Sequence, residues 1–479
     1  MSGKAFTQTI YIDALALVSQ KKSGVGLTLE QIVKNLQLQK GGRKYTIYLV
    51  VPLAKARYLR KYLGSNVKTK TIYLPARLME VLLRLGLFPP ADWFLGRGIY
   101  LFPNYRNWPL WRSKSLTYIY DLGFLLFPET VQPKNQKYLR RYINRWVWRT
   151  DKLVTISHQV MGEIEKHLNV PYNMIEVIYC GVDKSLFYRR TASEIATIKK
   201  KYNINFENYF LFVGNIEPRK NLIKLLEAYE KLPDRLRKTY GLVIVGSEGW
   251  LNQEFYTRLA QAQADSEKVL KVAQYVKNED LPALYSGAAA LVQPAVYEGF
   301  GITPLEAMAC ETPVAVSDVP AIREVVQTAG CYFDPSSSDS IARALVKVAK
   351  NEALRRTLIG EGKKRAEELT WAKTARQLIS VIETEIAKGP RNKPVIMRLK
   401  ALHNRADQKI RAALGEKPYD AYRPRGAKTK QELKQIISQD FAYEQPTLLQ
   451  IFLLATYLRT KHLLAIPIKK TYRMARSFR

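Results

Sequence analysis

Short runs of β-branched and aromatic residues alternate with helix-forming segments along most of this chain, and the alternation restarts once. Strands that alternate with helices are typical of parallel sheets covered by helices on both faces. One set of runs ends near residue 179, and a second begins at residue 209 after a polar stretch at 188–208. The pattern therefore predicts an α/β fold with two doubly wound parallel sheets.

The expected strands are short, and helices fit between them, for example at 220–232 and 338–350. Strands of the first set are expected at 11–17, 45–51, 71–75, 99–103, 116–121, 152–157 and 175–179. Strands of the second set are expected at 209–214, 241–246, 269–276, 289–294 and 312–318.

The length of the chain, 479 residues, is too great for one compact core. We expect a first α/β domain over residues 1–183 and a second over 184–388, joined near 184–190. The sequence GPRNKP at 389–394 has the composition of a linker. Residues 389–479 therefore form a separate C-terminal extension, which we expect to be helical.

That extension is strongly basic, with 20 Lys or Arg against 6 Asp or Glu. Its apolar stretch at 448–458 is too short to cross a membrane and is followed by several Lys and Arg residues. One interpretation is a helix that lies in the interface of a membrane. The other is a helix packed on the rest of the protein, followed by a solvated basic tail. The sequence leaves both open.

The whole chain carries a formal net charge of +34, which calls for an anionic partner such as nucleic acid, anionic lipid or a phosphorylated substrate. The positive charge is spread over the chain and no nucleic-acid-binding motif is present, so a nucleic-acid-binding protein is the weaker interpretation. The three cysteines form no CxxC pair, which indicates reduced, buried thiols in a cytosolic protein. Neither a signal peptide nor an uninterrupted apolar run of spanning length is recognisable.

Two glutamates flank a glycine-containing loop in the stretch YEGFGITPLEAMACETP at 297–313. Thr303 is expected to be a helix N-cap, with Glu306 three positions later closing a capping box. Glu306 therefore either caps its own helix or contacts a ligand. Glu298 has no helix to cap and follows a strand end, where α/β sheets bind ligands. It either accepts hydrogen bonds from sugar hydroxyls or is a solvated surface residue.

Two further segments have the character of phosphate sites. GNIEPRKNL at 214–222 places Arg219 and Lys220 after a strand and before a helix, where adjacent cations suit a diphosphate. SGVGLTLEQI at 23–32 places Gly24 and Gly26 at the start of another helix, and short glycine turns allow a backbone to approach a phosphate or sugar.

Taken together, these motifs resemble the donor-binding domain of glycosyltransferase family 4. The resemblance covers roughly residues 8–388 and extends to the first domain through SGVG, FPNY, YDLGFLLFPE, TISHQV and IYCGVDKSLF. It implies the GT-B architecture, in which two Rossmann-like domains face a cleft, the first on the acceptor side and the second binding the nucleotide sugar.

The resemblance also implies roles for matching positions. Glu298 would contact the donor sugar, Glu306 the nucleotide ribose, and Lys220 with Arg219 the diphosphate. Members usually carry His-Asp where this chain has Tyr120 and Asp121, so the Tyr120 hydroxyl would take the place of the histidine near the donor. The remaining residues expected to line the donor site are Gly24, Gly26, Asp121, Gly299, Phe300, Gly301, Ile302 and Thr303.

By the same resemblance, the reaction is transfer of a hexose from a nucleotide-diphosphate sugar, such as GDP-mannose or a UDP-hexose, with retention at the anomeric carbon. The acceptor would be a glycan or a lipid-linked glycan in cell-envelope polysaccharide or glycolipid synthesis. No metal or other cofactor is expected, and the enzyme would be cytoplasmic and peripheral on the inner face of an anionic membrane. The replacement at Tyr120 leaves a nucleotide-sugar-binding scaffold or a GT-B epimerase as alternatives.

Overall fold

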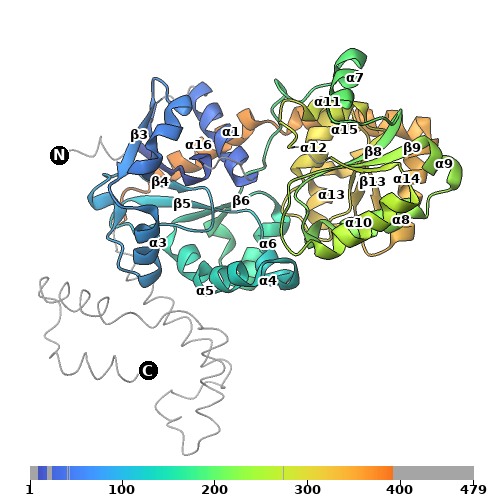
Figure 1. Cartoon of the computed structure of the whole chain (residues 1–479). Coiled ribbons are helices and arrows are strands. Elements are labelled where there is room, and N and C mark those ends of the chain that lie inside the picture. Colours follow the sequence, from blue (N-terminus) through green and yellow to red (C-terminus); the bar gives the residue numbers. More distant parts are fainter. Residues whose placement is uncertain (1–8, 19–23, 40, 42–43, 273–274, 392–479) are drawn as a thin grey trace, which may run out of the picture.

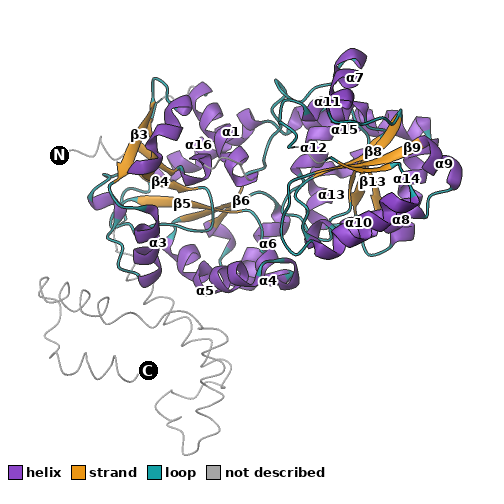
Figure 2. Cartoon of the chain, viewed as in Figure 1, coloured by secondary structure: helices purple, strands orange, loops and turns teal. Residues whose placement is uncertain are grey.

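The structure is a computed structural model that describes residues 9–18, 24–39, 41, 44–272 and 275–391. These residues form two lobes, each built around one parallel sheet with helices on both faces (Figure 1; Figure 2). The α/β fold predicted from the alternation of strands and helices is confirmed. The predicted helical extension lies outside the described residues from residue 392 onward.

The first lobe contains a seven-stranded sheet within the described residues, in the order β3-β2-β1-β4-β5-β6-β7, and every neighbouring pair is parallel. Its strands are β1 (Thr9–Asp13), β2 (Thr46–Pro52), β3 (Val67–Ile72), β4 (Ile99–Phe102), β5 (Lys114–Ile119), β6 (Lys152–Thr155) and β7 (Ile175–Val177). Its helices are α1 (Gly24–Leu38), α3 (Ala76–Leu85), α4 (Gly123–Leu126), α5 (Pro133–Arg149) and α6 (His158–Leu168). Its 3₁₀ turns are η2 (Leu15–Val18), η3 (Leu53–Tyr62), η4 (Ala91–Trp93), η5 (Pro128–Thr130) and η6 (Tyr172–Met174).

The second lobe contains a six-stranded parallel sheet within the described residues, in the order β10-β9-β8-β11-β12-β13. Its strands are β8 (Asn208–Val213), β9 (Tyr240–Val245), β10 (Val269–Lys271), β11 (Ala290–Gln293), β12 (Val314–Ser317) and β13 (Gly330–Phe333). The helices from here to the end of the described chain are α7 (Ala192–Lys201), α8 (Leu222–Glu230), α9 (Asp234–Thr239), α10 (Gln253–Asp265), α11 (Leu281–Gly287), α12 (Ile302–Ala309), α13 (Pro320–Val326), α14 (Ser338–Lys350), α15 (Glu352–Glu368) and α16 (Trp371–Ala387). The 3₁₀ turns are η7 (Pro218–Lys220) and η8 (Gln327–Ala329).

Several elements differ from the sequence prediction. The strand expected at 71–75 is β3 at Val67–Ile72, and the strand expected at 269–276 is β10, which ends at Lys271. The strand expected at 11–17 ends at Asp13, because the Asp13 carboxylate accepts a hydrogen bond from the Leu15 amide at 3.1 Å and the chain turns into η2. The helix expected at 220–232 is divided, since Asn221 adopts a left-handed conformation (φ 57°) between η7 and α8. Strand β13 was not predicted, because four residues beginning with glycine give too short a signal.

Helix α16 returns to the first lobe, although the sequence prediction placed it in the segment 184–388. It lies against α1, as the orange helix beside the blue one shows (Figure 1). The Lys114 ammonium of β5 donates a hydrogen bond to the Glu385 carbonyl at 2.7 Å, and both side chains are buried. The chain therefore crosses between the lobes twice, once after β7 and once before α16.

The two crossing segments lie side by side. The Val182 amide donates to the Leu369 carbonyl at 3.0 Å, and the Thr374 hydroxyl donates to the Tyr179 carbonyl at 2.7 Å. One apolar core cluster runs through this junction and contains buried residues from both sheets, so the two lobes share part of their core. Across the described residues, the apolar length needed to cross a bilayer is not reached by any helix.

Candidate active site between the two sheets

The site lies where the strand order of the second sheet reverses. β8 and β11 are neighbours in the sheet. After β8 the following strands, β9 and β10, are added on one side, and after β11 the following strands, β12 and β13, are added on the other side. Such a switch point leaves a crevice at the carboxyl ends of the two strands. The loop after β8 carries Arg219 and Lys220, and the loop after β11 carries Glu298. The fold thus brings Glu298 together with Arg219 and Lys220, which precede it by 79 and 78 positions in the sequence.

Glu298 is the centre of this cluster and is 8% exposed. Its carboxylate accepts hydrogen bonds from the Arg219 guanidinium at 3.0 Å and from the Gln293 amide at 2.7 Å, and forms an ion pair with the Lys220 ammonium. Burial alone would raise the pKa of Glu298, but Lys220 and Arg219 outweigh it and lower the pKa below the usual range. Glu298 is therefore an ionised, buried carboxylate rather than a solvated surface residue.

Arg219 links the two lobes electrostatically. Its guanidinium donates to the Glu217 carboxylate at 2.7 Å and to the Tyr297 carbonyl at 2.8 Å. Burial would lower the pKa of Arg219, but the negative charges of Glu298, Asp121 and Glu217 raise it. Because Asp121 belongs to the first lobe, the guanidinium lies within the field of both lobes.

Glu306 does not cap its own helix. Helix α12 begins at Ile302 after Gly301, which adopts a left-handed conformation (φ 109°), so the predicted N-cap at Thr303 is wrong. The turn at glycine starts the helix two residues earlier than a Thr303 cap would. The Glu306 carboxylate instead accepts a hydrogen bond from the buried Tyr285 hydroxyl at 2.9 Å. Burial raises the pKa of Glu306 to about 7.

The segment 299–303 lies against the first lobe. The Phe300 side chain is 4% exposed and lies against the Tyr179 ring, so it is part of the core. Gly299 is in close contact with the first lobe: a Cβ atom there would lie 2.1 Å from the Tyr120 carbonyl oxygen. The first turn of α12 follows directly at Ile302 and Thr303, and a helix N-terminus of this kind favours anions.

Tyr120 and Asp121 face the second lobe from the end of β5. The Asp121 carboxylate accepts hydrogen bonds from the Tyr105 hydroxyl and the Gly123 amide, both at 3.0 Å. The Tyr120 ring stacks on Tyr118 with ring centres 5.6 Å apart. Its hydroxyl is buried and has no hydrogen-bond partner among the described residues, and burial raises its pKa.

Gly24 and Gly26 form the first turn of α1 rather than a loop before it. A Cβ atom at Gly24 would meet no atom within 4 Å, so its surroundings are open. Their predicted place beside the donor remains a prediction.

Four residues of the site region were not predicted: Gln293, Tyr297, Glu163 and Ser157. Gln293 is a buried amide at the end of β11 and holds Glu298 directly. A polar residue at the end of an apolar strand was the available signal for Gln293. Glu163 and Ser157 lie on α6 and at its N-cap, and no sequence pattern connects them with a loop 140 residues away.

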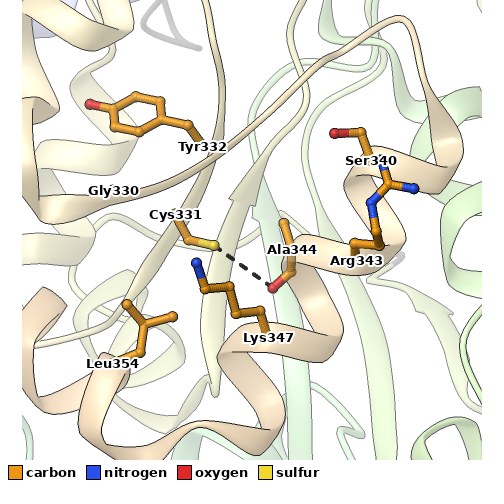
Figure 3. A pocket seen from close by; sticks show the side chains of 8 residues that line it. All are labelled: Gly330, Cys331, Tyr332, Ser340, Arg343, Ala344, Lys347 and Leu354. Atoms are coloured by element: carbon orange, nitrogen blue, oxygen red, sulfur yellow. Dashed lines mark hydrogen bonds between the residues drawn. The ribbon is translucent and has the colours of Figure 1, made fainter.

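A separate pocket of about 230 Å³ lies in the second lobe between β13, α14 and α15 (Figure 3). Cys331, Arg343 and Lys347 line it, and none of the predicted site residues does. In the described part of the chain, three or more His, Cys, Asp or Glu side chains do not gather in a group that could hold a metal ion.

Two parallel-sheet lobes that meet at these charged loops define a two-domain protein of the GT-B fold class. Residues 194–365 match the family described as Glycosyl transferases group 1. The O-antigen chain mannosyltransferase B of Escherichia coli is 30% identical over 284 residues, which cover 59% of this chain and 73% of that protein. The chain belongs to the group 1 glycosyltransferase family.

Further comparisons agree with this assignment. The O-antigen chain mannosyltransferase RfbU of Salmonella typhimurium is 34% identical over 242 residues, which cover 50% of this chain and 62% of RfbU. Among solved structures, the sucrose-phosphate synthase of Thermosynechococcus elongatus superposes with a TM-score of 0.61 at 19% identity, over 80% of this chain and all of that one. WaaG, a glycosyltransferase of lipopolysaccharide biosynthesis, superposes with a TM-score of 0.57 at 15% identity, over 78% of this chain and 99% of WaaG. These structural likenesses concern the fold.

Proposed function

We propose that this protein is a retaining mannosyltransferase that moves a hexose from a nucleotide-diphosphate sugar to a growing cell-envelope glycan. GDP-mannose is the donor that the similarity to two O-antigen mannosyltransferases favours. A UDP-hexose is the second candidate donor, since a similar fold binds UDP and glucose in HepE of Anabaena. The acceptor in this proposal is a glycan or a lipid-linked glycan.

One observation carries the proposal: Arg219, Lys220 and Glu298 meet at the switch point of the second sheet. Two cations beside a helix N-terminus can hold a diphosphate, and a buried carboxylate beside them can accept hydrogen bonds from sugar hydroxyls. In the structure Glu298 pairs with both cations, and Glu217 supplies a second carboxylate to Arg219. A bound diphosphate would share the cations, which frees lone pairs of Glu298 for the sugar.

The chemistry in this proposal depends on stabilising the leaving group. As the bond from the anomeric carbon to the diphosphate breaks, negative charge grows on the diphosphate oxygens. In this proposal Arg219, Lys220 and the amides at the start of α12 stabilise that charge. The acceptor hydroxyl attacks from the same face, and the leaving diphosphate takes its proton, so that the anomeric configuration is retained. No metal cofactor enters this scheme.

The test is a screen of nucleotide sugars with the full chain. GDP-mannose should raise the melting temperature and be turned over slowly by hydrolysis, and GDP should be released. Glu298→Gln should lower turnover about tenfold, which corresponds to about 1.4 kcal/mol in the transition state. Lys220→Met should weaken binding of GDP more than binding of free mannose.

Glu311→Gln is the matched control, since Glu311 lies on the same stretch but pairs with Lys363 at the surface. It should leave turnover unchanged. A stable protein that binds donor without turning it over would favour the scaffold alternative. Failure of every nucleotide sugar to bind would overturn the donor assignment.

The proposed place of action is the surface of an anionic membrane. Helix α3 buries Met79 and Leu83, yet it leaves Leu78, Val81 and Leu85 exposed on a second apolar face. Their spacing of three and four residues places them side by side. Further exposed residues on this part of the lobe are Trp93 (64%) and Phe94, with the arginines Arg77, Arg84, Arg97 and Arg112. An apolar face bordered by arginines suits insertion into an anionic lipid surface.

Sedimentation with lipid vesicles tests this location. The full chain should pellet with vesicles that contain anionic phospholipid, and less so as salt rises, because screening weakens the attraction. Combined Leu78→Ser, Val81→Ser and Leu85→Ser substitutions should reduce the bound fraction. Replacing Tyr172, Leu251 and Tyr275 with Ser is the matched control, as these side chains are equally exposed elsewhere. Equal binding of both variants would exclude the α3 face.

A further inference from the structure

The residues on either side of Glu298 are both held by the other lobe. Tyr297 and Gly299 belong to the second lobe with Glu298, but their hydrogen bonds reach the first lobe, at Leu122 just before α4 and at Ser157 and Glu163 of the α6 region. The Glu298 carboxylate is held by Arg219, Lys220 and Gln293 of its own lobe. The first lobe therefore holds the residues on either side of Glu298 rather than its carboxylate.

Tyr297 makes the stronger of these connections. Its hydroxyl donates to the Glu163 carboxylate at 2.7 Å and accepts a hydrogen bond from the Leu122 amide at 2.9 Å. The ring is 6% exposed and lies 5.0 Å from the Phe127 ring, centre to centre. Both hydrogen-bonding directions of the hydroxyl are satisfied by the first lobe, which defines its orientation.

Glu163 is a buried acid that the proposed chemistry does not use. It lies on α6, is 7% exposed, and accepts a second hydrogen bond from the Gln159 amide at 2.6 Å. Burial raises the pKa of Glu163 and outweighs the hydrogen bonds from Tyr297 and Gln159, which lower it. Within the described residues, no Lys or Arg is paired with it in an ion pair. Burial of an acid is costly unless hydrogen bonds compensate for the lost hydration, and Tyr297 and Gln159 supply such bonds to Glu163.

The Gly299 side of the loop is held in a similar way. The Ser157 hydroxyl, which also caps α6, donates to the Gly299 carbonyl at 2.8 Å. The backbone of Tyr297 is bonded in turn by Arg219, through its carbonyl at 2.8 Å. The loop is thus clamped between the guanidinium of its own lobe and the α6 end of the other.

We propose that Tyr297, Glu163 and Ser157 are positioning residues that place Glu298 for the donor only when the two lobes are together. The inference rests on the proposed transfer reaction. In this arrangement Glu163 and Ser157 of the first lobe affect the transfer reaction through the position of Glu298, and they do not contact the donor themselves. Opening of the crevice releases both sides of the loop, so that Glu298 loses its orientation while Lys220 and Arg219 still bind a diphosphate.

The test separates chemistry from diphosphate binding. Tyr297→Phe removes the bond to Glu163 and keeps the ring, and Glu163→Gln replaces the carboxylate by a weaker acceptor. Each should lower kcat about tenfold or more, while the dissociation constant of GDP, measured by calorimetry, changes less than about twofold. The double variant should be no slower than the slower single variant, because both changes act on one contact.

Tyr179→Phe is the matched control. The Tyr179 hydroxyl also bonds across the lobes, to Glu324 at 2.6 Å, and the substitution keeps the ring that contacts Phe300. This variant should retain kcat. Spin labels at Asn135→Cys and Glu254→Cys, both exposed and on opposite lobes, report the distance between the lobes independently of activity. With GDP bound, Tyr297→Phe should leave that distance distribution unchanged, so that its loss of kcat reports the loop and not separation of the lobes.

Wild-type kcat in Tyr297→Phe would overturn the proposal. So would an equal loss in Tyr179→Phe, because the contact would then matter only for holding the lobes together. Ser157→Ala should show a smaller loss of kcat with the same unchanged affinity for GDP. If the wild-type chain itself transfers no sugar, the proposed function fails, and this outcome is distinct from a failure of the positioning proposal.

Discussion

Tyr120 is the residue at which this chain departs most clearly from the family pattern. Its hydroxyl is buried without a partner among the described residues, which is an unfavourable state for a polar group. A ligand that offers the hydroxyl an acceptor would relieve that cost. The observation fits the prediction that Tyr120 contacts the donor, which no measurement yet tests.

We predict that Tyr120→Phe leaves the free protein as stable as the wild type or more stable, because it removes an unsatisfied buried hydroxyl. Turnover should fall roughly fivefold. This corresponds to an activation free energy higher by about 1 kcal/mol, through loss of one hydrogen bond to the donor. Thermal unfolding and steady-state kinetics measure the two effects separately. Unchanged turnover would make Tyr120 a packing residue.

Glu306 gives a prediction about pH. Its pKa is about 7 in the folded protein, against 4.5 for a solvated glutamate, so the folded state disfavours the ionised form. The contribution of this carboxyl to the free energy of unfolding is therefore fully present below pH 4.5. It is lost as the pH rises through 7. At about 1.4 kcal/mol per pKa unit, wild type should lose about 3 kcal/mol relative to Glu306→Gln between pH 4.5 and 8.

The measurement is the melting temperature of both proteins across that range without donor. Glu306→Gln should be the more stable protein at pH 8, and the two curves should converge toward pH 4.5. Tyr285→Phe in the wild-type background should enlarge the difference, since the Tyr285 hydroxyl stabilises the ionised carboxylate. Parallel curves would show that Glu306 titrates as a solvated group.

At the scale of elements, the loop after β11 and the end of β5 approach each other so closely that only glycine fits at position 299. Gly299→Ala would place a methyl group 2.1 Å from the Tyr120 carbonyl oxygen, and because that atom is backbone, the two elements must separate. We predict a stability loss of about 1–3 kcal/mol and a lower kcat. Denaturant unfolding and kinetics measure both.

Gly24→Ala is the matched control, since a Cβ atom there has no neighbour within 4 Å. This change should alter stability by less than about 1 kcal/mol. If Gly299→Ala were equally harmless, the close contact between the lobes would not be present in solution.

At the scale of the whole molecule, the two lobes are joined by chain segments that cross side by side. Gly181 lies in the first crossing segment, and a Cβ atom there would lie 2.1 Å from the Trp371 amide nitrogen in the second. Gly181→Ala should therefore push the segments apart and weaken both lobes at once, because the core cluster continues through the junction. We expect one cooperative thermal transition shifted to lower temperature, by about 1–3 kcal/mol in stability.

Gly360→Ala serves as the control on α15, where a Cβ atom meets nothing within 4 Å. Alanine should be neutral there or stabilise the helix by up to about 1 kcal/mol. A Gly181→Ala protein in which one lobe unfolds well before the other would show that the junction does not couple them.

The sequence by itself determined the order of strands and helices, the two parallel sheets and most of the residues at the second sheet's switch point. It could do so because hydrophobic periodicity is local and because a parallel sheet places its loops at one edge. Arg219, Lys220 and Glu298 follow strand ends, so their meeting at one crevice follows from topology. The end of β1 and the short strand β13 were missed, since a side-chain turn at Asp13 and a four-residue edge strand leave little periodic signal.

Only the tertiary structure decided which lobe carries α16, that Gly301 rather than Thr303 starts α12, and that Tyr297 is held by Glu163. The start of α12 depends on a backbone angle that glycine permits but does not require. The bond between Tyr297 and Glu163 joins residues 134 positions apart on different lobes. Its partner is selected by how the two lobes meet, which depends on the shared core and on the second crossing of the chain.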